Sequence, residues 1–196
     1  MRYLLILLLL NSFALFSHSK GSSHASAEWQ IEAYGSAAPD FIGNYATIIG
    51  GDGEVLHEGS NGWTCQAGNA RPFPKMGWAN AHDAMPLCMD ENAVKFMNGQ
   101  QDKMTGDGWA WMLHGDVGED NTAPGVLNKK DSTPGQWIES GPHMMLMPKD
   151  AKTIAHMSDD FTVGAPYVMM PNTPMAHVMI PLPGYYVYQP ESNPKN

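Results

Sequence analysis

Short segments of the C-terminal half are rich in apolar residues, and the side chains of one of them alternate with a period of two, which predicts β-strands. In "GWAWMLHGD" the two tryptophans and Leu113 fall on one face, whereas Ala110, Met112 and His114 fall on the other. "HMMLM", "YVMM" and "HVMIPL" are further predicted strands, and the last two are joined by a Pro- and Asn-containing turn. The C-terminal half is therefore expected to form a sheet.

The N-terminal half carries a hairpin signal and one clear helix signal. "YATIIGGDGEVLHEG" places strands at 46–49 and 54–57 around a Gly-rich turn. Asp90 is a suitable N-cap for a helix through "ENAVKFMNGQ", which Gly99 would end, and a second short helix is expected in "KDAKTIAHMSDD". The predicted fold class is α+β, a mostly antiparallel β-sheet with two short helices and a long loop braced by a disulfide.

The first residues have the pattern of a secretory signal peptide. Met1 and Arg2 precede the apolar run "YLLILLLLNSFALF", and small residues follow at Ser17 and Ser19, so we expect cleavage after Ser19, with Ala27 as the second choice. The mature protein is then exported, to the periplasm or the extracellular space, and is not inserted in a membrane. The predicted organisation is a signal peptide at 1–19, a flexible segment at 20–39 with a short helix near 29–34, a single globular domain at 40–190 and a tail at 191–196.

Charge and cysteine content narrow the class of protein further. The formal net charge of −9 argues against nucleic acid and anionic membrane surfaces as partners. The chain has two cysteines, Cys65 and Cys88, and in an exported protein such a pair is most simply a disulfide. It would stabilise the fold by roughly 3 kcal/mol in the chain-entropy model. A pair of thiolate metal ligands is the alternative, although C-x-x-C is absent.

Methionine is the most unusual feature of the composition. The chain has 15 methionines, and all except Met1 lie between Met76 and Met179. "ESGPHMMLMP" and "TPMAHVMIPLP" each carry a histidine followed two residues later by a methionine, His143 with Met145 and His177 with Met179. Residues i and i+2 share a strand face, and these pairs also share it with Met147 and Met175, respectively. Met112 and His114 form a third pair of this kind.

Imidazole and thioether groups together are suitable ligands for copper, and thioether favours the cuprous ion. If the two C-terminal strands are neighbours, His143, Met145, His177 and Met179 could converge on one soft-metal ion, with copper as the expected metal. Methionine also fills irregular cores, and the same residues could be core side chains only.

A metal-free binding module is the second hypothesis. Asn61, Trp63 and Trp78 lie on the predicted long loop and could contact a small ligand, a glycan or another protein. Trp109 and Trp111, by contrast, are expected to be buried in the sheet. No motif selects a reaction, and the adjacent His82 and Asp83 give only a weak hint of acid–base chemistry, so binding is favoured over catalysis.

Four motifs resemble those of a family of small exported bacterial proteins. They are "GSNGWTC", "CMDE", "GPH" and "TPMAHVMIP", which lie between about Ile48 and Leu182. The family has no established activity, so the resemblance implies export and a set of marked positions only. These positions are Asn61, Gly62, Trp63, Cys65, Cys88, Asp90, His143 and His177.

Overall fold

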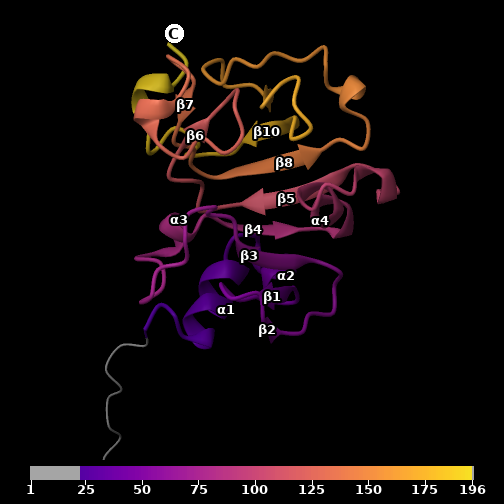
Figure 1. Ribbon diagram of the computed structural model, residues 1–196, viewed down its shortest axis with the longest axis vertical. Coiled ribbons are helices and arrows are strands. Elements are labelled where there is room, and N and C mark those ends of the chain that lie inside the picture. Colours follow the sequence, from indigo (N-terminus) through magenta and orange to yellow (C-terminus); the bar gives the residue numbers. More distant parts are fainter. Residues whose placement is uncertain (1–22, 196) are drawn as a thin grey trace, which may run out of the picture.

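The strands of one large sheet follow one another along the long axis of the molecule (Figure 1). The computed structural model describes residues 23–195, so the predicted signal peptide lies outside the described residues. The sheet has eight strands in the order β2-β1-β3-β4-β5-β8-β10-β9, and a separate two-stranded sheet pairs β6 with β7. The strands are β1 Thr47–Ile49, β2 Val55–His57, β3 Thr64–Ala67, β4 Pro86–Met89, β5 Gly108–Met112, β6 Glu119–Asp120, β7 Trp137–Ile138, β8 His143–Met147, β9 Tyr167–Met169 and β10 His177–Pro181.

The predicted fold class is confirmed, with more helices than the sequence indicated. Every neighbouring pair in the large sheet is antiparallel except β1 with β3. The four α-helices of the described residues are short, and single 3-10 turns accompany them. The helices are α1 Ala27–Gly35, α2 Asp40–Gly43, α3 Ala81–Ala84 and α4 Glu91–Met97, and the 3-10 turns are η1 Gln101–Lys103, η2 Lys129–Asp131, η3 Ala151–Thr153 and η4 Pro190–Ser192.

Helix α4 forms as its sequence predicts and covers one face of the sheet. The Asp90 side chain accepts a hydrogen bond from the Ala93 backbone N–H at 2.8 Å, which caps the helix. Phe96 is 2% exposed and points into the main core. A Cβ atom on Gly108 would lie 2.3 Å from the Ala93 backbone nitrogen, so a glycine in β5 lets α4 approach the sheet.

The predicted disulfide joins Cys65 of β3 to Cys88 of β4. The two cysteines face each other directly in the antiparallel register, and both are buried. The disulfide thus joins the two ends of the long chain segment from Cys65 to Cys88, and this segment also contains α3. The disulfide therefore cross-links two neighbouring strands of the sheet as well as closing an irregular loop.

Three local predictions differ from the structure. The segment "KDAKTIAHMSDD" forms only the single turn η3, since its one deeply buried apolar residue, Ile154, gives no helical stripe to pack. Within the N-terminal segment, Tyr34, Ala37 and Ala38 are buried, so α1 and the residues after it pack into the domain. In the predicted tail, Ser192 is buried and accepts a hydrogen bond from Gln189.

The two faces of the large sheet bury different side chains. One face, under α4, carries the main core, in which methionines are the commonest residue. The opposite face has two clusters, one around α1 and the disulfide, the other around Ile154, Val168 and Val178. No helix within residues 23–195 is long and apolar enough to cross a bilayer.

Candidate soft-metal site

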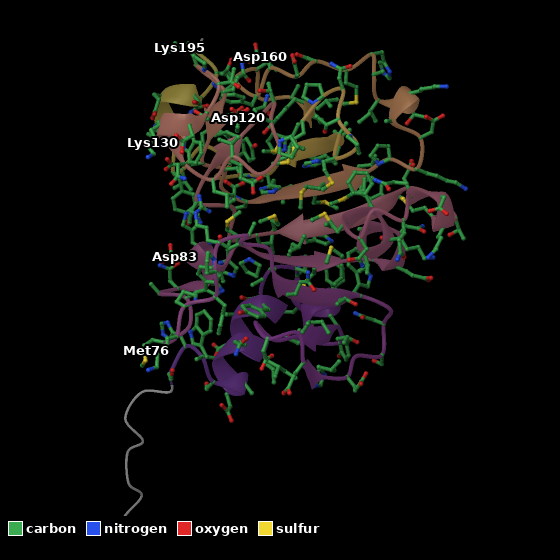
Figure 2. All side chains as sticks on the ribbon, in the orientation of Figure 1. Met76, Asp83, Asp120, Lys130, Asp160 and Lys195 are labelled. Carbon is green, nitrogen blue, oxygen red and sulfur yellow. A yellow bond between two sulfur atoms is a disulfide. The ribbon has the colours of Figure 1, made fainter. Side chains whose placement is uncertain are left out.

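Strands β8 and β10 are neighbours and bring both His-x-Met pairs onto one face of the sheet. Met145 faces Met179 directly in the register, while His143 faces Pro181. Strand β5 places Met112 opposite His143, and β9 places Met169 opposite His177. Sulfur atoms accordingly gather over β5, β8 and β10 (Figure 2). The four residues predicted as a site therefore share one face.

All four residues line a single cavity of about 210 Å³. Most of its wall is apolar, and methionine supplies much of it. The methionines are Met85, Met97, Met112, Met145, Met147, Met169, Met170, Met175 and Met179. Met97 is 43% exposed, whereas Met145 and Met179 are buried. Thioether groups thus line the cavity from the protein surface to the buried region that contains the two imidazoles.

Both imidazole rings are held in a tautomer that leaves Nε2 available as a metal ligand. The Nδ1 atom of His143 lies 2.8 Å from the Gly141 carbonyl oxygen, and that of His177 lies 2.8 Å from the Met175 carbonyl oxygen. A carbonyl can only accept, so each Nδ1 carries the proton and each Nε2 presents its lone pair. The buried Nε2 of His143 has no hydrogen-bond partner among residues 23–195.

Burial keeps both rings neutral. It lowers the pKa of His177 to about 4, because the charged form would lose its water; the Met175 carbonyl opposes this weakly and the neighbouring His143 reinforces it. Burial also lowers the pKa of His143, against the opposing effect of the Asp116 carboxylate and the Gly141 carbonyl. Near neutral pH neither ring has to release a proton before it binds a metal.

The two histidines lie at opposite ends of the Met145–Met179 pair. His143 faces Pro181, which is four residues beyond His177 on β10, so about 13 Å of strand separates the two positions. The register therefore arranges the site as an imidazole, a pair of thioethers and a second imidazole.

Two carboxylates add negative charge to the same cavity. Asp116 accepts hydrogen bonds from the Ser140 hydroxyl and from the Gly118 backbone N–H, and the Ser140 hydroxyl oxygen lies 3.3 Å from Nδ1 of His143. Glu119 also lines the cavity, and its pKa rises to about 7 because of burial and the nearby Asp116 charge, with Arg71 opposing the rise. Ion pairs would neutralise these carboxylates, but none involves Asp116 or Glu119 within the described chain. At neutral pH the Asp116 carboxylate lines the cavity beside a Glu119 side chain that is about half protonated.

Hard-ligand chemistry has no comparable arrangement. No three His, Cys, Asp or Glu side chains of residues 23–195 are grouped so that they could hold a metal ion. Both cysteines are in the disulfide, which removes the thiolate alternative. The usual zinc and calcium arrangements, which use three or more such ligands, therefore do not occur among the described residues.

The residues of the second hypothesis do not form a common surface. Trp78 is 7% exposed and packs in the cluster around α1, where Trp63 is half-buried. The Asn61 side-chain amide donates to the Ile42 carbonyl oxygen, and its oxygen accepts from the Trp63 backbone N–H. The Asn61 hydrogen bonds fix the chain locally. The packing of Trp63 and Trp78 leaves only part of each indole ring exposed for a ligand to stack on.

The third His-Met pair is wrong, and so is the expected burial of Trp109. Strand β5 ends at Met112, and His114 lies in the following turn with Nε2 2.8 Å from the Ser36 hydroxyl. Trp109 is 38% exposed, since the face of β5 that it occupies is not covered by α4. His114 therefore stays outside the cavity that Met112 lines.

Some cavity residues were not singled out from the sequence. Met169 in "YVMM" could have been grouped with the site only if the pairing of β9 with β10 were known, because their register places it opposite His177. Glu119 lies on the short strand β6 of the second sheet and has no sequence pattern that links it to the histidines.

The comparisons with known proteins return no match for this chain among protein-family models, curated proteins or solved structures. The functional assignment consequently depends on the chemistry of the cavity.

Proposed function

We propose that this protein is exported and binds a soft metal, copper in its cuprous form, with His143, Met145, His177 and Met179 among the ligands. The observation that carries the proposal is the orientation of the two imidazoles. Each ring is fixed through Nδ1 by a backbone carbonyl, and each presents an unprotonated Nε2 in a cavity walled by thioether groups. Metal-bound histidines characteristically have this second hydrogen bond.

A purely structural role explains these imidazoles less well. A buried polar atom without a partner costs roughly 1–3 kcal/mol, and Nε2 of His143 is such an atom. A methionine-rich core alone would have no need for either ring, whereas a bound cation would satisfy the lone pair.

The ligand chemistry favours the cuprous over the cupric ion. Thioether is a soft ligand, and Cu(I) prefers soft ligands and accepts low coordination numbers, whereas Cu(II) prefers tetragonal nitrogen and oxygen ligands. A cuprous ion also brings a single charge into a largely apolar cavity, and the Asp116 carboxylate lines that cavity.

Titration with Cu(I) against a competing chelator, without oxygen, tests the proposal. The variant His143→Ala/His177→Ala should bind with an affinity lowered by more than about 100-fold, since loss of outer ligands alone costs 10–100-fold. The matched control, His57→Ala/His156→Ala, removes two exposed histidines and should bind as the unmodified protein does. Equal affinity in both variants would refute the proposal.

A further inference from the structure

The site has an internal symmetry that a single metal ion does not explain. In an antiparallel pair of strands, a local two-fold axis passes through each directly opposed pair of residues, and here it passes through Met145 and Met179. This axis relates β8 to β10, and it exchanges His143 with His177, because each histidine precedes its methionine by two residues.

The contacts of the two histidines follow the same symmetry. In both cases Nδ1 donates to the carbonyl oxygen of the residue two positions earlier, and both distances are 2.8 Å. Each histidine also faces a methionine on its outer neighbouring strand, Met112 on β5 or Met169 on β9. Directly opposed residues have Cβ atoms about 5 Å apart, so these thioethers are within reach of the rings.

The cavity thus contains two equivalent sets of ligands. We define the first half-site as His143, Met112 and Met145, and the second half-site as His177, Met169 and Met179. Each has one imidazole and two thioethers, which suits a three-coordinate cuprous ion.

One shared ion would fit this arrangement poorly. To bind one ion at ~2 Å, the two Nε2 atoms would have to lie within about 4 Å of each other. The two histidine positions are about 13 Å apart along the strands, and strand side chains stand roughly perpendicular to the sheet. The Met145–Met179 pair also lies between them.

We propose that the cavity binds two cuprous ions, one in each half-site. This inference rests on the proposed function and adds its stoichiometry and ligand sets. The cavity of about 210 Å³ has room for two ions, and the Asp116 carboxylate lines the same space.

The test is a titration of the full mature chain with Cu(I), without oxygen and against a chelator of known affinity. The unmodified protein should bind two equivalents. His143→Leu should bind one equivalent, His177→Leu should bind one, and the double variant should bind none. Met112→Leu/Met145→Leu keeps the ring and nearly the side-chain volume, so it should weaken only the first half-site. Met144→Leu, on the opposite face of β8, is the matched control and should bind two equivalents.

The possible results separate this inference from the proposed function. One equivalent in the unmodified protein, lost in either single histidine variant, would overturn the two-ion arrangement and leave the proposed function standing. No binding by the unmodified protein would overturn both. More than two equivalents would show that other thioethers bind independently, and this too would overturn the half-sites. The stoichiometry of the unmodified protein distinguishes one, two and more ions, and Met112→Leu/Met145→Leu, which nearly keeps the side-chain volume, tests the first half-site if a histidine variant fails to fold.

Discussion

Burial of His177 should make the stability of the metal-free protein depend on pH in a defined window. In the folded protein the pKa of His177 is about 4, compared with an ordinary value of 6.5. The unfolded chain therefore takes up a proton near pH 6.5, while the folded protein resists it until about pH 4. Stability is fully present above pH 6.5 and is lost as the pH falls toward 4. At about 1.4 kcal/mol for each pH unit, the loss is about 3 kcal/mol. His143 adds to it in the same direction.

Urea unfolding of the metal-free protein at several values between about pH 7.5 and pH 4.5 measures this loss. Carboxylates titrate in part of the same window, so the informative quantity is the difference from the variant His177→Gln, which has no titrating ring. That difference should change by roughly 2–3 kcal/mol between pH 7.5 and pH 4.5. A constant difference would mean that His177 is solvated and protonates normally, and the desolvated, neutral ligand inferred here would be wrong.

Further changes test other parts of the fold. Replacing both cysteines, Cys65→Ala/Cys88→Ala, should lower the free energy of unfolding by about 3 kcal/mol, given a sequence separation of 23; an unchanged urea midpoint would contradict the entropic account. Phe96→Ala should cost about 3–5 kcal/mol in thermal or urea unfolding, and a loss below about 1 kcal/mol would place the ring outside the core. The pKa of Glu119 is raised in the folded protein, so the folded protein holds this proton more tightly than the unfolded chain does. The stability that comes from the protonated carboxyl group is present at low pH and is lost as the pH rises through about 7. Glu119→Gln should then be more stable than the unmodified protein at about pH 8 and similar to it near pH 4.5, and the reverse order would contradict the assigned burial.

The fold could be predicted where local patterns decide the structure. The hairpin of β1 and β2 follows from its Gly-rich turn, and α4 follows from the Asp90 cap. Strands β8 and β10 follow from short apolar runs in which a histidine and a methionine are two residues apart. Strand β4 was missed because all of its residues are buried, and a strand buried on both faces shows no alternation.

The candidate site could be predicted only in part, because register is a non-local property. The sequence identifies His143 and His177 with their following methionines, and a period of two places each pair on one face. It cannot tell that β8 pairs with β10, or that β5 and β9 flank this pair. Met169 and the local two-fold symmetry became apparent only from that pairing. His114 was assigned wrongly because the alternation in "GWAWMLHGD" continues past the point where β5 ends.

The most direct test of the central claim is X-ray absorption spectroscopy at the copper edge on the Cu(I)-loaded protein. The proposed function predicts a cuprous edge and a first shell that contains both imidazole nitrogen and thioether sulfur, and the two half-sites predict about two sulfur atoms for each nitrogen. His143→Ala/His177→Ala should retain little copper, and any copper that it retains should have no imidazole nitrogen in its first shell. A first shell of nitrogen and oxygen alone, or one that is unchanged in that variant, would contradict the account.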